Sequence, residues 1–191
     1  LVKTGGFTGD LEQDFAWGWA ETREDKLVAS SDIEVAAGNA AITDSSAIKW
    51  AGYRGADRNS IVKANLLETD WENNPPTELW RQEVGPGWSS FAAQENVFFT
   101  QEQRGEEEMV SCYETETGKA VWRYGDNVRF WESNAGAGPR GTPTLYAGRV
   151  FSLGATGIVN ALNASTGKRI WSRDANEDTG TQIPTWGYSG S

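Results

Sequence analysis

An internal repeat constrains the fold of this chain more than any other sequence feature. Residues 110–122 read VSCYETETGKAVW and residues 159–171 read VNALNASTGKRIW, so the two copies begin 49 residues apart and share Val, Thr, Gly, Lys and Trp in register. A second matching pair precedes them, ENVFFTQ at 95–101 and GRVFSLG at 148–154. Units of this length bury a hydrophobic face by stacking on their neighbours. The sequence therefore predicts an array of equivalent units.

Each unit is predicted to be a group of short antiparallel strands. Runs such as VFF, MVSCY, RVFSL and GIVNAL have the β-branched and aromatic content of strands and are too short for helices. The TGK triplet of each copy predicts a hairpin turn with a bulge, in which Gly118 and Gly167 supply the positive φ. Repeats of three or four strands over about 40 to 50 residues are typical of propeller blades. We therefore expect an all-β fold, a partial β-propeller built of antiparallel blades.

Three of the ten tryptophans follow the repeat. Trp80, Trp122 and Trp171 each come directly after an apolar residue, at intervals of 42 and 49 residues. This regular spacing predicts that they pack between neighbouring blades rather than bind a ligand.

Trp88, Trp131 and Trp186 lie instead among glycines, in the segments between the predicted blades. An indole in such a segment can stay exposed or line a cleft, where its flat apolar face stacks well on a sugar ring. We predict these three tryptophans as the ligand-stacking residues of the chain.

The N-terminal part of the sequence does not follow the repeat. TREDKLVAS at 22–30 begins with a Thr22 to Asp25 capping pattern and predicts one short helix. Residues 31–49 are rich in Ala, Ser and Gly and predict an irregular connector. Further along, ELWRQEVGPGWSSF at 78–91 is predicted to be the closing strand of one blade leading into the next.

These patterns divide the chain into an N-terminal extension and a propeller part. The extension is predicted to cover residues 1–49, with the short helix and the irregular segment. The propeller part is predicted to cover residues 50–191, as a partial blade to about 84, blades at about 85–124 and 137–173, and the start of a next blade at 184–191.

The composition excludes several functions. The chain has no histidine, which removes the usual general base, the Ser/His and Cys/His nucleophile systems and the commonest metal ligand. A net charge of −10 and a pI near 4.6 disfavour nucleic acid and anionic membrane surfaces as partners. No run approaches the roughly 20 apolar residues of a membrane-spanning helix. The one cysteine, Cys112, lies in the apolar run MVSCY and is predicted to be a buried structural thiol.

Three stretches resemble functional motifs, and none is predicted to act as one. GAGPRG at 136–141 has the spacing of a dinucleotide fingerprint, but no convincing strand precedes it and no helix pattern follows. DANEDTG at 174–180 departs from a calcium loop, with Thr179 and Thr185 where glycine and glutamate belong, and is predicted to be a solvated loop. RGEEEM at 104–109 is predicted to be a charged hairpin tip. No catalytic residue and no metal ligand is therefore assigned.

The repeat core has the form hydrophobic-x-x-x-x-T-G-K-x-hydrophobic-W, and it resembles the PQQ-like repeat of quinoprotein alcohol dehydrogenase-like β-propellers. That family also includes non-enzymatic outer-membrane assembly lipoproteins. Further stretches look like a bacterial subgroup of PQQ-binding-like propeller proteins, namely WAGYRGADRNSIV (50–62), W-x(4)-PP-x(2)-LWR (71–81), GPGWSSF (85–91), RFWES with GAGPRGTPTL (129–145), GATGIVNAL (154–162) and PTWGYSGS (184–191). The resemblance covers residues 50–191 well and the first 30 residues loosely.

The resemblance implies an exported, periplasmic protein, often anchored to a membrane through an upstream N-terminal segment, with a ring of about eight blades. Only two complete repeats and a partial one are visible, and an unclosed set of blades leaves strand edges exposed. We therefore expect a fragment of a longer propeller, or a chain that self-associates through its open blade edges. The favoured function is a non-catalytic binding or scaffold module in the cell envelope, whose partner is a protein or an envelope component.

Two other functions stay open. For a PQQ-dependent dehydrogenase, the resemblance implies a quinone between a Trp floor and a vicinal disulfide, beside a calcium ion and an aspartate base. The single cysteine cannot form that disulfide within this chain, and no quinone or calcium ligand transfers to a numbered position. No cofactor is therefore evident, and PQQ and calcium follow from the resemblance alone. The second alternative is a carbohydrate-binding propeller with Trp88, Trp131 and Trp186 as its stacking residues.

Overall fold

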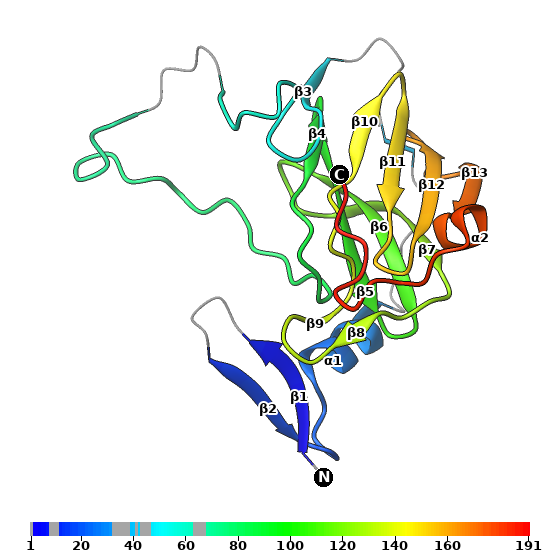
Figure 1. Cartoon of the computed structure of the whole chain (residues 1–191). Coiled ribbons are helices and arrows are strands. Elements are labelled where there is room, and N and C mark those ends of the chain that lie inside the picture. The colour runs from blue at the N-terminus through cyan, green and yellow to red at the C-terminus, as the bar shows by residue number, and fades with distance from the viewer. Residues whose placement is uncertain (1, 8–11, 32–38, 41, 43–46, 63–67) are drawn as a thin grey trace.

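The computed structural model describes the chain except for residues 1, 8–11, 32–38, 41, 43–46 and 63–67. Much of the predicted irregular connector at 31–49 lies outside the described residues. In the described part, Figure 1 shows two antiparallel sheets packed side by side, an N-terminal hairpin set apart from them, and two short helices. These sheets confirm the predicted all-β class and the partial propeller.

Blade 1 is a sheet of five antiparallel strands, in the order β3 (Ile48–Trp50), β4 (Ala92–Gln94), β5 (Val97–Arg104), β6 (Glu107–Glu114) and β7 (Ala120–Asp126). β5, β6 and β7 are the strands that the first repeat copy predicts. β3 is an addition to the prediction, and it pairs with β4 by placing Ile48 opposite Gln94.

Blade 2 is a sheet of four antiparallel strands, in the order β10 (Thr144–Tyr146), β11 (Arg149–Leu153), β12 (Ile158–Asn163) and β13 (Arg169–Asp174). The predicted turns are confirmed, since Gly118 and Gly167 both have a φ of 68°. The predicted bulge is confirmed too, and the pairing register shifts directly after Cys112 in blade 1 and directly after Ala161 in blade 2.

The N-terminal residues form a hairpin of β1 (Val2–Phe7) and β2 (Gln13–Trp17), which the sequence did not indicate, and then the predicted helix α1 (Arg23–Ser31). The capping box at the start of α1 is present. The Thr22 amide donates to Asp25 Oδ2 at 2.9 Å, and the Asp25 amide donates to Thr22 Oγ1 at 3.0 Å.

Two smaller elements flank blade 2. A short hairpin of β8 (Trp131–Glu132) and β9 (Gly136–Ala137) precedes it, and α2 (Ala175–Thr179) follows it. The helix α2 corrects the prediction of a solvated loop at 174–180. Asp174 caps it by accepting hydrogen bonds from the amides of Asn176 and Glu177, and Gly180 ends it with a φ of 66°.

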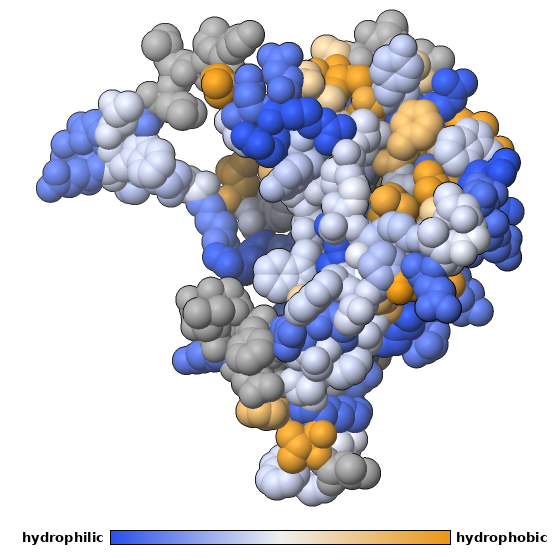
Figure 2. Space-filling view, in the orientation of Figure 1, coloured by the Kyte–Doolittle hydropathy of each residue, from blue (hydrophilic) through white to orange (hydrophobic). Residues whose placement is uncertain are grey.

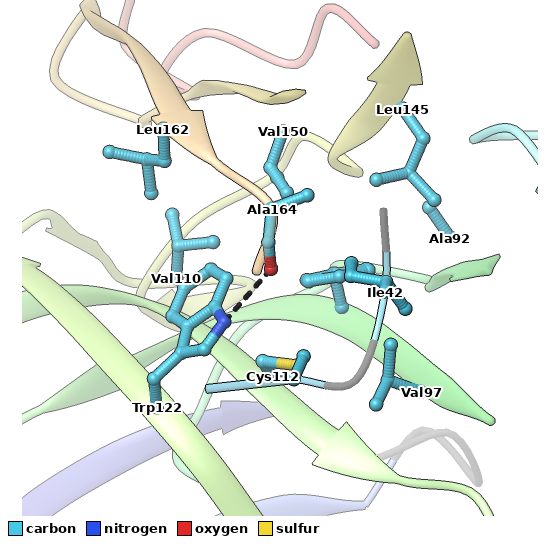
Figure 3. Packing of buried hydrophobic residues seen from close by; sticks show 12 residues of the cluster. Ile42, Ala92, Val97, Val110, Cys112, Trp122, Leu145, Val150, Leu162 and Ala164 are labelled. Atoms are coloured by element: carbon cyan, nitrogen blue, oxygen red, sulfur yellow. Dashed lines mark hydrogen bonds between the residues drawn. The ribbon is translucent and has the colours of Figure 1, made fainter. Parts of the chain in front are cut away.

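The interface between the two blades is the hydrophobic core (Figure 3). Phe99, Cys112 and Trp122 are cross-strand neighbours on β5, β6 and β7, and we call them the aromatic row of blade 1. This row is buried against a face of blade 2 that includes Val150 and Leu162. The predicted burial of Cys112 is thereby confirmed, and burial raises the pKa of its thiol.

Trp122 joins blade 1 to the hairpin turn of blade 2. Its indole lies against Gly167, so close that a Cβ built on this glycine would come within 2.6 Å of the ring. Its Nε1 donates to the Ala164 carbonyl at 3.0 Å (Figure 3). The turn therefore needs glycine for two reasons, because its φ is positive and because the indole occupies the space of a side chain.

The same contact recurs one unit earlier in the chain. Trp80 lies against Gly118, where a Cβ would come within 2.5 Å of the indole, and Trp80 Nε1 donates to the Thr115 carbonyl at 2.9 Å. In each case the accepting carbonyl belongs to the third residue before the glycine. The predicted packing role of Trp80 and Trp122 is therefore confirmed.

Trp171 occupies the equivalent position in blade 2, but no turn covers it among the described residues. Phe151, Ala161 and Trp171 are cross-strand neighbours, and we call them the aromatic row of blade 2. The ring centroids of Phe151 and Trp171 lie 6.2 Å apart, and Trp171 is 42% exposed. Blade 2 thus presents the kind of surface that blade 1 buries.

The predicted closing strand at 78–91 is wrong, because this segment is coil. Pro86 has no amide hydrogen, and its carbonyl accepts from the Gln103 amide at 2.8 Å without starting a ladder of strand hydrogen bonds. Gly85 approaches the Gln103 carbonyl so closely that a Cβ could not fit. In Figure 1 the described residues between β3 and β4 extend away from the sheets before this segment returns to blade 1.

Hydroxyl groups connect the segments that lead into successive blades. The Ser90 amide donates to Thr142 Oγ1 at 3.0 Å, and the Thr142 amide donates to Ser191 Oγ at 2.8 Å. Ser90 and Thr142 hold corresponding places, each two residues before a strand, β4 and β10 respectively, and Ser191 lies at the C-terminal end. The repeat therefore shapes the connecting segments as well as the strands.

Replacing Gly167 by alanine tests the contact between Trp122 and the turn. Gly180 offers a matched control, because its φ of 66° resembles the 68° of Gly167 while nothing lies within 4 Å of a Cβ built there. Both variants incur the left-handed backbone cost of about 1 kcal/mol. Gly167→Ala must also displace the indole, and we expect it to lower the free energy of unfolding in urea by a further 1 to 3 kcal/mol or so. Equal losses in the two variants would contradict the contact.

Candidate functional site

The three tryptophans predicted to stack on a ligand are all about half exposed. Trp88 is 56%, Trp131 49% and Trp186 58% exposed. Trp88 lies against the β8–β9 hairpin, since its Nε1 donates to the Ala135 carbonyl at 2.8 Å, and Trp131 is the first residue of that hairpin. Trp186 lies in the C-terminal segment, and the ring contacts of the described residues do not join any two of the three.

Trp131 lines a cleft of about 860 Å³. The cleft lies between the N-terminal hairpin, the start of α1, the turn after β5, the segment at 83–86 and the β8–β9 hairpin. Its lining includes Trp131 and the charged residues Lys3, Arg23, Glu24, Asp25, Glu83, Glu106 and Arg129. Trp88 and Trp186 do not line it.

An ion pair joins the two walls of this cleft. Arg129 Nη1 and Nη2 donate to the two carboxylate oxygens of Glu24 at 2.6 and 2.8 Å, a bidentate arrangement. The Gly105 amide also donates to Glu24 Oε1 at 2.9 Å, and Arg129 donates to the Gly105 carbonyl. The hydrogen bonds and charge of Glu24 raise the pKa of Arg129 further above its ordinary value. This group fixes α1 to the turn between β5 and β6.

Contacts within the β8–β9 hairpin fix the backbone of Trp131. Phe130 is buried, and the guanidinium of Arg140 lies 5.2 Å from the centre of its ring. Arg140 also pairs with Glu132 at 3.5 Å, with both side chains almost fully buried. Glu132 in turn accepts from the amides of Asn134 and Ala135. The Trp131 backbone is therefore anchored, while its side chain reaches solvent.

A buried carboxylate fixes the coil segment at 78–91 on blade 1. Glu102 accepts hydrogen bonds from Ser111 Oγ at 2.5 Å, from the Tyr113 hydroxyl at 2.6 Å and from the Gly85 amide at 2.6 Å. Arg104 lies 3.1 Å from the same carboxylate. Burial raises the pKa of Glu102, but the charge of Arg104 and these hydrogen bonds outweigh it and lower that pKa below its ordinary value. The carboxylate is fully engaged in structural contacts.

A second buried carboxylate lies between the blades. Glu108 is 6% exposed and accepts a hydrogen bond from the Ala155 amide of blade 2 at 3.0 Å. Its cross-strand partner on β7 is Asp126, which accepts from Asn160 Nδ2 at 2.6 Å. Burial and then the charge of Asp126 raise the pKa of Glu108 to about 7, against the opposing effects of the Ala155 amide and Arg140.

The predicted charged hairpin tip at 104–109 is confirmed as a turn, and two of its charged residues, Arg104 and Glu108, are buried. β5 ends at Arg104 and β6 begins at Glu107, so Gly105 and Glu106 make the turn. Arg104 and Glu108 are buried by the ion pair with Glu102 and by blade 2, respectively. The sequence pattern could not show the burial of Glu108, because the blade 2 segment that covers it, which includes Ala155, lies far along the chain.

GAGPRG at 136–141 has a structural role rather than a phosphate-binding one. The stretch begins with β9, and the next described element is strand β10 rather than a helix, which a dinucleotide fingerprint requires. A Cβ on Gly138 could not fit against the Pro86 carbonyl, and one on Gly141 would lie 2.6 Å from the Gly190 carbonyl. These glycines therefore permit the close approach of the segments that lead into successive blades.

The family comparison agrees with this architecture. The family model described as outer membrane protein assembly factor BamB matches residues 71–185, more than half of the chain. The chain belongs to this family. The resemblance of its repeats to PQQ-like propeller repeats is thereby confirmed. No curated protein matches the chain.

Solved structures of PQQ-like propellers align with part of the chain. Quinohemoprotein alcohol dehydrogenase from Comamonas testosteroni is 17% identical with a TM-score of 0.38, covering 49% of this chain and 14% of the enzyme. Quinohemoprotein alcohol dehydrogenase ADHIIG from Pseudomonas putida HK5 is 20% identical with a TM-score of 0.36, covering 52% and 14%. BamB from Moraxella catarrhalis is 18% identical with a TM-score of 0.26, covering 47% and 35%. The chain thus spans a minor part of each of these relatives.

The residues of this PQQ-like chain do not fit a quinone and calcium site. Its one cysteine is buried in the aromatic row of blade 1, so it cannot take part in a vicinal disulfide beside a quinone. Within the described residues, no group of three or more His, Cys, Asp and Glu side chains could hold a metal ion. No helix among them is long and apolar enough to span a membrane.

Glu108 predicts a pH dependence of the blade interface. Because its pKa is raised from 4.5 to about 7 on folding, the folded chain holds this proton more tightly than the unfolded chain. The stability that Glu108 contributes is therefore fully present below about pH 4.5 and is lost as the pH rises through about 7. Glu108→Gln keeps the acceptor for the Ala155 amide but has no proton to lose. Relative to wild type, we expect it to gain up to about 3 kcal/mol across this range.

The measurement is urea unfolding of both proteins near pH 4.5 and above pH 7. Glu107→Gln is the matched control, since Glu107 is the exposed neighbour on β6 and its substitution changes the net charge equally. Parallel pH profiles for Glu108→Gln and wild type would show that Glu108 is not the group responsible.

Proposed function

We propose that this chain is a non-catalytic binding or scaffold module of the cell envelope, and that it forms part of a longer periplasmic PQQ-like propeller. The observation that carries the proposal is the aromatic row of blade 2, in which Trp171 is 42% exposed and Phe151 is half-buried, while Ala161 between them is buried. The equivalent row of blade 1 is buried by the next blade. Because the aromatic row of blade 2 resembles that of blade 1, we favour a further blade as the partner that covers it.

The buried polar groups of blade 1 also support a rigid scaffold, because they are used for structural contacts. Glu102 and Glu108, two carboxylates of blade 1 that are shielded from water, both accept hydrogen bonds from backbone amides of neighbouring segments. Cys112 is packed in the core. These groups stabilise the contacts between blades, which suits a module that presents surfaces to a partner. The family description, which names an outer-membrane assembly factor, supports a protein partner in the envelope.

Trp171 provides the test of the longer propeller. In the 191-residue chain, Trp171→Ala should lower the free energy of unfolding by no more than about 1 kcal/mol, because this side chain is already 42% exposed. Trp122→Ala is the matched variant and should cost about 3 to 5 kcal/mol, because its indole is buried between blades. In the longer protein we expect the two losses to become similar. A Trp171→Ala loss that stays small there would contradict the proposed covering blade.

Equilibrium dialysis of PQQ against the longer protein, with and without calcium, separates the scaffold from the dehydrogenase alternative. We expect no binding in the micromolar range, since the residues of this chain do not fit the group. Calcium-dependent binding of micromolar strength or tighter would replace the scaffold proposal by the dehydrogenase.

A further inference from the structure

We propose that the cleft beside Trp131 binds an uncharged oligosaccharide. The Trp131 indole stacks on one pyranose ring, and the side chains of Arg23, Glu83 and Glu106 form hydrogen bonds with the hydroxyl groups of the sugar. This adds a ligand site to the scaffold proposed above and does not depend on it. Of the three tryptophans that the sequence singles out, the structure thereby assigns the stacking role to one.

Trp131 is preorganised for stacking. Its neighbour Phe130 is buried under Arg140, and its backbone pairs with Ala137 across the β8–β9 hairpin. Among the described residues its indole forms no hydrogen bond and no ring contact, so its face and its Nε1 are available. A fixed, half-exposed indole loses little conformational entropy when a flat apolar ligand face stacks on it.

Charged side chains that can bind hydroxyl groups line the same cleft as Trp131. Lys3, Arg23, Glu83 and Glu106 all line the cleft, and in the described part of the chain none of their side chains forms a hydrogen bond or a salt bridge, although the charges of Lys3 and Glu106 act on Asp25 and Arg129. A carboxylate accepts from two neighbouring hydroxyls, and a guanidinium donates to two. Neighbouring hydroxyls at fixed spacing are what a sugar offers. The cleft volume of about 860 Å³ suits a ligand of several sugar units.

The net charge of the cleft selects against anionic ligands. Four carboxylates, those of Glu24, Asp25, Glu83 and Glu106, outnumber the three cations Lys3, Arg23 and Arg129. Asp25 is ionised well below neutral pH, because its hydrogen bonds to Thr22 lower its pKa. A phosphate or a uronic acid would meet a net negative site on a chain of net charge −10. An uncharged ligand avoids this repulsion and still uses the hydrogen-bonding groups.

The arrangement of the cleft also explains why one tryptophan suffices. Trp88 uses its Nε1 on the Ala135 carbonyl and lies outside the cleft, and Trp186 lies in the C-terminal segment, also outside it. Both are exposed to the same degree as Trp131, so exposure alone does not define the site. Substituting either of them is therefore a control for the loss of a surface indole.

The experiment is titration of the 191-residue chain with cellotetraose, maltotetraose and tetra-N-acetylchitotetraose, followed by isothermal calorimetry and tryptophan fluorescence. At least one probe should bind with a Kd of about 1 mM or tighter. Trp131→Ala should weaken that binding at least tenfold, whereas Trp186→Ala should leave it unchanged. Glu83→Gln removes a charge but no indole, and it should weaken binding several-fold with an unchanged unfolding midpoint.

The proposal is overturned if none of the three probes binds, or if Trp131→Ala binds as tightly as wild type. It is also overturned if Trp186→Ala weakens binding as much as Trp131→Ala while Glu83→Gln has no effect, because the ligand would then lie elsewhere. A failure here leaves the scaffold proposal standing, since that proposal is tested by Trp171 and by PQQ dialysis.

Discussion

The contact between the Trp122 indole and Gly167 sets the geometry on which the rest of the structure depends. The indole stacks where a side chain would be, and the hydrogen bond from Nε1 to the Ala164 carbonyl fixes its orientation. One glycine therefore supplies both the left-handed turn of its own hairpin and the receiving surface for the preceding blade. Because Trp80 and Gly118 repeat this contact, the spacing of successive units is specified locally rather than by the total size of the core.

Two buried carboxylates on neighbouring strands show how partners, rather than burial alone, decide the charge inside blade 1. Glu102 has a cation at 3.1 Å and three hydrogen-bond donors, and its pKa is lowered. Glu108 has one amide donor and faces Asp126 across the strand pair, and its pKa is raised. Glu102 thus holds its segment at every physiological pH, whereas the contribution of Glu108 to the blade interface weakens as the pH rises through neutrality.

The strands of the repeat could be predicted because their signals are local. TGK turns, β-branched runs and a tryptophan at a fixed spacing all lie within one unit. β3 could not, since Ile48–Trp50 becomes a strand only by pairing with β4, far along the chain. The segment at 78–91 looks like a strand, but Pro86 and the close approach of Gly85 to Gln103 make it coil.

The helix α2 did leave a signal in the sequence, the capping pair Asp174 and Glu177, in a stretch that was otherwise compared only with a calcium loop. The cleft beside Trp131 joins five segments, and no sequence spacing relates them.

The filled glycine turns limit how a second copy of the chain could cover blade 2. A second copy could cover the aromatic row of blade 2 in the manner of blade 1 only by offering a glycine turn to Trp171. Gly118 is already occupied by Trp80 and Gly167 by Trp122 of their own chain. In the described residues, each glycine turn that uses this contact is therefore filled, and a copy could receive Trp171 only by giving up a buried indole that costs about 3 to 5 kcal/mol to remove. Covering this face with a second copy in that manner is therefore costly, and a partner that brings its own unfilled turn fits better.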